Sequence, residues 1–290
     1  MSVIKKSATL AVVGALLAAC ASIIALNNGA FATHPLQPGS AGWFVILGAA
    51  FLTGYIDTCV GGGHGTLLTP VLIMLGFPAK MVVPAILLSE ICIGLLATVL
   101  NHRAGNLHLA HDSLHWKVLM VLAGCSLVGS ILAVTAAVRL PAQWIDLYIG
   151  LVVVGVGILM LTGRKLSRTF SMKRIVLVGA VAAFNKGISG GGYGPLLTSG
   201  QVLSGVSEKG AVSITPPARG LTGAISVALY FFSKGTLEPN LALPLIIGSL
   251  LAMPVAVATV TVIEPTMLRK GIVLSTLLLG AFLVVRVFIR

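Results

Sequence analysis

A glycine-rich stretch at residues 57–70 recurs in altered form at residues 186–199. The first stretch reads DTCVGGGHGTLLTP and the second reads KGISGGGYGPLLTS. Three glycines, a variable residue, a fourth glycine and the run Leu-Leu-Thr align between them at a constant offset of 129 positions. In a chain of 290 residues, this offset indicates that the second half duplicates the first.

The segments around these motifs are apolar enough to lie in a membrane. Hydrophobic residues make up 57% of the chain and charged residues 9%, whereas soluble domains carry about 25% charged residues. Several apolar runs reach the roughly 20 residues that a helix needs to cross the hydrocarbon, and the alternation typical of a membrane barrel is missing. Because helices satisfy their own backbone hydrogen bonds in lipid, the sequence predicts an all-α polytopic membrane protein.

Each half is expected to contain a helical hairpin that turns at its glycines, followed by three full spans. In the first half the hairpin covers residues 43–56 and 66–77, and the spans cover residues 78–100, 116–138 and 144–161. In the second half the hairpin covers residues 175–188 and 195–203, and the spans cover residues 209–232, 241–263 and 267–287. An extra N-terminal span is expected at residues 8–26, with a cleaved signal peptide as the alternative.

Basic residues predict how the chain is oriented. Their densest cluster lies in the short connection at residues 163–174, and cytoplasmic loops of membrane proteins are rich in Lys and Arg. We therefore expect an N-terminal span and exterior connection (residues 1–40), repeat one (41–163), a cytoplasmic linker (164–174) and repeat two (175–290). The two repeats then enter from opposite sides and have inverted topology, with a cytoplasmic N-terminus. We attribute the net charge of +12 to this bias.

Four ionisable residues lie in apolar surroundings and match in pairs under the same offset. Asp57 matches Lys186, and Glu90 matches Arg219. Charges inside a membrane are costly and are retained for a partner, a cavity or a function. Two interpretations follow. Lys186 and Arg219 bind an anion in a central cavity, with the acids as counter-ions or coupling groups, or the four residues form structural ion pairs in which either acid meets either base.

The glycine turns offer backbone amides between short helices. Amides at a helix N-terminus bind anions, although glycines also permit tight turns and close helix packing. His64 and Tyr193 occupy the variable position, and either side chain can donate to an oxyanion. No metal, cofactor or catalytic residue is expected. The predicted substrate-binding residues are Gly61, Gly62, Gly63, His64, Lys186, Gly190, Gly191, Gly192, Tyr193 and Arg219, with Asp57 and Glu90 as coupling or counter-ion residues.

The motifs GGGHGTLLTPVL and NKGISGGGYGPLLT resemble those of the sulfite exporter TauE/SafE family, within the toluene-sulfonate uptake permease group. The resemblance covers residues 42–290. It implies a bacterial-type inner-membrane transporter of small sulfur-containing anions, such as sulfite, sulfoacetate or other organosulfonates, that is driven by an ion gradient. The sequence departs from the common family pattern in its extra N-terminal span, in Glu90 and in Pro216-Pro217.

These observations together predict a secondary active transporter, an exporter or permease, with an anion site between the repeats. A passive anion channel and a transporter of a different small anion or solute remain as alternatives. An enzyme is not expected, because the loops contain no nucleophile with an oriented base. The expected partners are a small anionic substrate and the lipid bilayer, with protons as the candidate coupling ion and with no nucleic acid. A homo-oligomer remains open.

Overall fold

The computed structural model describes residue 14 and residues 37–60, 63–103, 113–162, 169–234, 238–259 and 265–289. These residues form helices joined by short connections and contain no strand, which confirms the predicted all-α class. Apart from Gly14, the predicted N-terminal span lies outside the described residues. The helices are α2 (Ala41–Val60), α3 (His64–Met74), α4 (Ala79–Arg103), α5 (Leu114–Arg139), α6 (Ala142–Thr162), α7 (Met172–Ser189), α8 (Tyr193–Leu203), α9 (Glu208–Lys234), α10 (Pro239–Thr259) and α11 (Pro265–Ile289).

Six of these helices are long and apolar enough to cross a membrane: α2, α4, α5, α6, α10 and α11. Many of their large apolar side chains point outward, among them Leu95, Leu127 and Leu151, each more than half exposed. An apolar surface of this extent is stable against lipid and not against water. Helix α9 has 27 residues but is not among the six, and it carries Arg219 and two prolines. The chain is therefore a multi-pass membrane protein.

The two predicted hairpins are present, and a glycine precedes the short helix of each. In the second hairpin, α7 ends at Gly190, whose φ of 68° lies in the left-handed region, and Gly192 precedes α8 with a φ of 74°. Residues with a side chain rarely adopt this conformation, whereas glycine adopts it readily. In the first hairpin, Gly63 precedes α3. Each hairpin therefore pairs a long helix with a helix of 11 residues that is too short to span alone.

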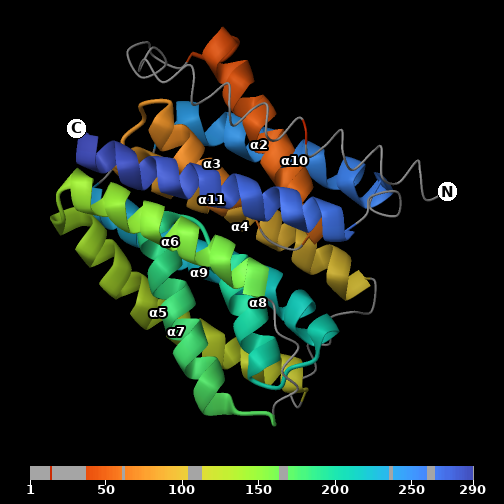
Figure 1. Ribbon diagram of the computed structural model, residues 1–290. Coiled ribbons are helices and arrows are strands. Elements are labelled where there is room, and N and C mark those ends of the chain that lie inside the picture. Colours follow the sequence, from red (N-terminus) through yellow and green to blue (C-terminus); the bar gives the residue numbers. More distant parts are fainter. Residues whose placement is uncertain are drawn as a thin grey trace.

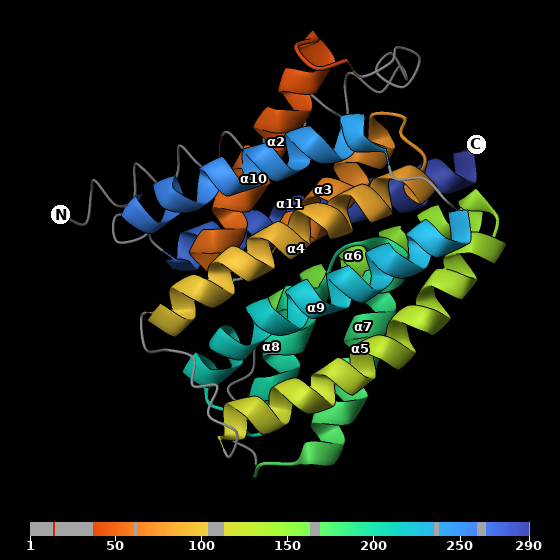
Figure 2. The same ribbon diagram turned by 180° about the vertical axis from the view of Figure 1, so that it is seen from behind.

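The ten described helices pack as two bundles that do not coincide with the sequence repeats. The first bundle contains α2, α3 and α4 of repeat one together with α10 and α11 of repeat two, and the second bundle contains α7, α8 and α9 with α5 and α6. Helix α10 packs on α2, as α5 packs on α7. The bundles meet where α4 lies against α9 and α6 against α11 (Figures 1 and 2). Each repeat therefore contributes two helices to the other repeat's bundle.

Equivalent helices at the boundary run in opposite directions. Gly94 of α4 lies against Gly220 of α9, whereas Leu87, two turns earlier in α4, lies against Gly223, later in α9. The contacts between α6 and α11 follow the same antiparallel order. This is the arrangement that an inverted duplication requires. The orientation of the repeats relative to a membrane stays a prediction.

Each bundle contains a close contact between a glycine and an alanine. The glycine lies on the hairpin helix in the first bundle and on the helix from the other repeat in the second bundle. In the first bundle, Gly54 of α2 faces Ala252 of α10, and a Cβ built on Gly54 would lie 3.4 Å from the Ala252 Cβ. In the second bundle, Ala183 of α7 faces Gly129 of α5, and a Cβ built on Gly129 would lie 2.8 Å from the Ala183 Cβ. Small residues let membrane helices approach closely. The long helix of each hairpin is thus held tightly against the other repeat.

Candidate functional site

The four matched charges lie at the boundary between the bundles. Asp57 is near the end of α2 and Glu90 is in the middle of α4, so both acids belong to the first bundle. Lys186 is near the end of α7 and Arg219 is in the middle of α9, so both bases belong to the second. Lys186 is fully buried, and the other three keep only 4–5% exposure. The boundary therefore separates buried negative charge from buried positive charge.

Two ion pairs cross this boundary. The Nζ atom of Lys186 contacts Oε2 of Glu90, and Nη1 of Arg219 donates to Oδ2 of Asp57 over 2.6 Å. Exchanging the repeats turns one pair into the other, because Asp57 is equivalent to Lys186 and Glu90 to Arg219. The sequence left the pairing open, and the structure resolves it. Each acid pairs with the base that is not its own equivalent.

Arg219 keeps one donor without an acceptor. Its Nε atom is buried and has no hydrogen-bond partner among the residues that the structure describes. Leaving a buried donor unsatisfied costs about 1–3 kcal/mol, and more for a charged group. The guanidinium can donate two parallel hydrogen bonds to an oxyanion. Arg219 thus has unused capacity at the boundary even while it is paired with Asp57.

His64 begins α3 and is fully buried beside Asp57. Its backbone amide donates to Oδ1 of Asp57 over 3.3 Å. Its ring contacts hydroxyl groups from three helices of the first bundle: Thr53 Oγ1 at 3.1 Å from Nδ1, and Ser89 Oγ at 3.1 Å and Ser249 Oγ at 3.3 Å from Nε2. The first variable position is therefore a buried imidazole enclosed by hydroxyls, next to one of the ion pairs.

Tyr193 occupies the equivalent position in the second bundle and has different chemistry. Its hydroxyl lies 3.0 Å from Thr222 Oγ1, and Thr222 in turn lies 2.6 Å from Ser126 Oγ. The Nζ atom of Lys186 lies 5.1 Å from the centre of the Tyr193 ring, a distance at which a cation is attracted to the ring face. Tyr193 thus supports a charged site residue directly, as His64 does through its amide.

The two glycine turns lie against each other. A Cβ on Gly65 would overlap the carbonyl oxygen of Gly190, and one on Gly191 would lie 2.6 Å from the Gly65 carbonyl carbon. Only residues without side chains allow backbones to approach this closely. The amide of Gly192 donates across the contact to Thr66 Oγ1 over 2.8 Å. The turns therefore form the centre of the boundary between the bundles.

The amides of the second turn all have protein acceptors in this conformation. Gly190 donates to the Lys186 carbonyl oxygen, Gly191 to Ser189 Oγ and Gly192 to Thr66 Oγ1, over 2.8, 3.1 and 2.8 Å. The sequence predicted that these amides are exposed, and close packing accounts for the difference. Gly61 and Gly62 of the first turn lie outside the described residues, whereas Gly63 is described. A role for the glycine amides in binding an anion stays a prediction.

The sequence model of the sulfite exporter TauE/SafE family matches residues 45–283. The match includes both turns and all four charged residues. This chain belongs to the sulfite exporter TauE/SafE family. No curated protein and no solved structure matches the chain. The resemblance predicted from the two glycine motifs is confirmed, and this TauE/SafE protein is a member of a family of membrane anion exporters rather than of a family of enzymes.

Several polar residues at the boundary site of this TauE/SafE protein were not predicted from the sequence. Thr53 and Ser249 contact His64, and Asn185 donates to the Gly191 carbonyl oxygen over 3.0 Å. Hydroxyl residues are common in membrane helices, where they bond their own backbone. No sequence signal separates Thr53 or Ser249 from the others. Asn185 does precede Lys186 in the second motif, and this position beside a charged residue was the available signal.

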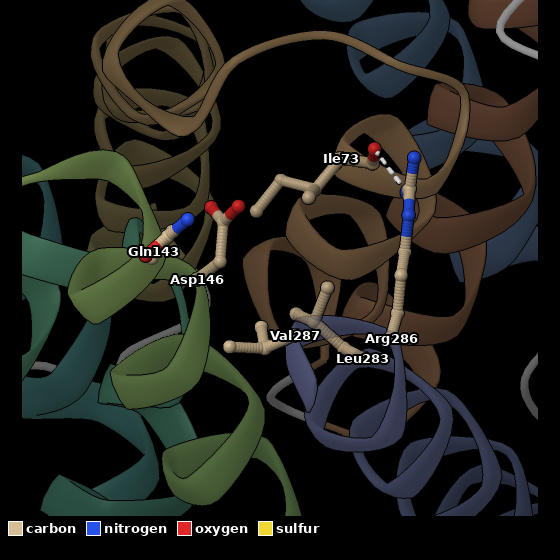
Figure 3. A pocket seen from close by; sticks show the side chains of 6 residues that line it. All are labelled: Ile73, Gln143, Asp146, Leu283, Arg286 and Val287. Atoms are coloured by element: carbon tan, nitrogen blue, oxygen red, sulfur yellow. Dashed lines mark hydrogen bonds between the residues drawn. The ribbon is translucent and has the colours of Figure 1, made fainter. Parts of the chain in front are cut away.

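A separate pocket lies at the far end of α3, between α3, α6 and α11 (Figure 3). The guanidinium of Arg286 closes one side and donates to the Ile73 carbonyl oxygen over 2.8 Å. Ile73 lies nine positions after His64, which is about 14 Å along a helix. The pocket is thus distinct from the charged boundary. It is lined by Ile73, Gln143, Asp146, Leu283, Arg286 and Val287.

Proposed function

We propose that this protein is a secondary active transporter that exports a small sulfur-containing anion, such as sulfite or an organosulfonate. In this proposal the anion binds at the boundary between the bundles, to Lys186 and Arg219. Membership of the TauE/SafE family supports the class of cargo. The position of the two cations between two packed bodies supports the site, because transporters built from paired repeats bind their substrates between the moving parts.

The observation that carries the proposal is the buried Nε donor of Arg219 without an acceptor. A purely structural ion pair is expected to have all of its donors satisfied, because an unsatisfied buried donor lowers stability. A pyramidal or tetrahedral oxyanion offers several acceptor oxygens to one guanidinium. The unused donor therefore supports an anion ligand more than a structural ion pair alone.

The ion pairs have a defined role in the proposed cycle. With no anion bound, Asp57 and Glu90 neutralise the two bases and hold the bundles together. An arriving anion competes with the carboxylates for the same donors, so its binding weakens the contacts that cross the boundary. The bundles then rock against each other along α4–α9 and α6–α11. Separation of Gly65 from Gly191 in this movement would release the turn amides to face the anion.

Flux measurements in proteoliposomes test the proposed function. We expect saturable transport of sulfite or an organosulfonate that depends on a proton gradient. Arg219→Ala is expected to reduce this flux by at least tenfold, because it removes the donor at the anion site. Lys209→Ala removes an exposed cation from the same helix and is the matched control. Unitary conductance would instead identify a channel, and full flux without Arg219 would contradict the proposed site.

The proposed location is the inner (plasma) membrane, with the N-terminus and the linker at residues 164–174 in the cytoplasm. Arg174, the last residue of the linker, donates to the carbonyl oxygen of Leu203 at the end of α8. Lys209 follows six positions later in the chain. Clustering of basic residues at one end of the helices supports a cytoplasmic position. A cysteine in place of Lys173 is expected to react with a membrane-impermeant maleimide only from the cytoplasmic side. Reaction from the exterior would reverse the proposed orientation.

A further inference from the structure

The ring of His64 faces hydrogen-bond acceptors on both sides. Thr53 lies next to Nδ1, and Ser89 and Ser249 lie next to Nε2. Each of these three hydroxyls donates its own hydrogen to a helix carbonyl. The acceptors are the carbonyl oxygens of Ala49, Ile86 and Leu245, at 2.8, 2.8 and 2.6 Å.

A hydroxyl group has one hydrogen and two lone pairs. With their hydrogens used in the helices, Thr53, Ser89 and Ser249 can offer only lone pairs to His64. A neutral imidazole has one N–H and one bare nitrogen, so one of its nitrogens would face acceptors without a proton between them. The imidazolium has two N–H donors and satisfies both sides. The hydrogen bonds around His64 therefore fit the protonated ring better than the neutral ring.

The charged groups around His64 balance one another. Asp57 approaches from α2, Glu90 from α4, Lys186 from α7 and Arg219 from α9, and these four groups sum to zero. Among the described residues, α10 contributes the hydroxyl of Ser249 to the ring. A proton on His64 gives the boundary a net charge of +1. A singly charged anion then restores neutrality, which matters in a buried site where uncompensated charge is costly.

We propose that His64 binds the coupling proton of this transporter, and that one proton on its ring enters the site together with one singly charged anion. This inference rests on the proposed function for the presence of the anion. Proton and anion then travel in the same direction, so the transport is electroneutral. The direction of net transport follows the combined gradients of the proton and the anion, and export requires that the outward anion gradient exceed any inward proton gradient.

The second repeat supports a stoichiometry of one proton. Tyr193 stands at the position equivalent to His64. An ordinary phenol loses its proton near pH 10, whereas histidine is the side chain that changes charge between about pH 5 and 8. Of these two equivalent positions, only the one in the first half therefore carries a group that ordinarily titrates near neutral pH.

The first arm of the test measures proton uptake in weakly buffered solution when methanesulfonate, whose sulfonate stays ionised throughout the pH range, is added to the purified protein. At pH values where the anion-free His64 ring is neutral, we expect about one proton taken up per anion bound by the wild type, with affinity falling about tenfold per pH unit in that range. His64→Gln keeps a polar side chain but cannot titrate, so the remaining binding is expected to be weaker than that of the wild type at low pH, without proton uptake and without pH dependence. His102→Gln, at the exposed end of α4, is the matched control and is expected to behave as the wild type.

The second arm needs no anion and uses nitrogen-15 NMR of labelled histidines. We expect one imidazolium signal that is missing from His64→Gln and that moves to lower pH in the double variant Ser89→Ala, Ser249→Ala, which lacks the Nε2 acceptors. A ring that stays neutral down to pH 5 would overturn the proton site. Anion binding without proton uptake would overturn the coupling and leave the proposed function intact. Absence of sulfonate and sulfite flux with a normal His64 titration would overturn the proposed function instead.

Discussion

Asp57, Glu90, Lys186 and Arg219 form two ion pairs that are related to each other by exchange of the repeats. Removing charges from water costs several kcal/mol per ion, and well-packed apolar residues in place of a buried ion pair are often as stable. Stability alone therefore does not account for two such pairs inside a membrane protein. The Nε donor of Arg219, which has no acceptor among the described residues, also lowers stability.

The Lys186–Glu90 pair predicts that the loss of stability on replacing one residue depends on whether the other residue is replaced as well. Glu90→Gln leaves the fully buried Lys186 ammonium without its counter-charge, and we expect a loss of about 3–5 kcal/mol in unfolding free energy. The double variant Glu90→Gln, Lys186→Met has no unpaired charge and is expected to recover most of that loss. Equilibrium unfolding in detergent measures both values. Additive losses in the double variant would show that the two side chains do not interact.

At the residue scale, the sequence predicted the charged groups but not their partners. Asp57 and Arg219 are conspicuous because they lie in apolar runs, and the duplication reveals which residues are equivalent. Equivalence does not reveal proximity, because two residues related by a two-fold axis meet only if they lie near that axis. The hydroxyls of Thr53 and Ser249 could not be predicted at all. Their contacts with His64 depend on how α2 and α10 pack.

At the element scale, both glycine hairpins and the helices that follow them were predictable, although α9, predicted as a span at residues 209–232, is not among the six helices apolar enough to cross a membrane. The glycines interrupt two apolar segments at matching places, and each short helix that follows is too short to span a bilayer. The packing of α10 on α2 and of α5 on α7 was not predictable. Apolar helices are interchangeable by composition, so the choice of neighbour depends on small residues such as Gly54 and Gly129, which resemble other glycines in the sequence.

The contact between the two turns predicts that Gly191 tolerates no side chain. In Gly191→Ala the new Cβ would lie 2.6 Å from the Gly65 carbonyl carbon, so the turns must move apart. Overpacking of this kind costs roughly 1–3 kcal/mol. Gly124→Ala is the matched control, because its Cβ meets nothing within 4 Å, and we expect a change within about 1 kcal/mol. Thermal unfolding compares the two variants, and equal stability would contradict the close contact.

At the scale of the whole molecule, the two repeats are interleaved. Each bundle takes three elements from one repeat and two from the other, so neither repeat forms a packed body by itself. The two paired acids and the two paired bases then lie on the boundary, with the negative charges in one bundle and the positive charges in the other. In the proposed function, this boundary is the one that opens toward either side of the membrane in turn.

The most direct test of an anion site at this boundary is stabilisation of the purified protein by sulfite. A ligand at 100 times its dissociation constant stabilises the folded state by about 2.7 kcal/mol. We expect sulfite to raise the melting temperature of the wild type and of Lys209→Ala. The double variant Asp57→Asn, Arg219→Gln keeps the shape of the pair without its charges, and we expect it to fold without responding to sulfite. Equal stabilisation of this variant and the wild type would contradict the proposed site.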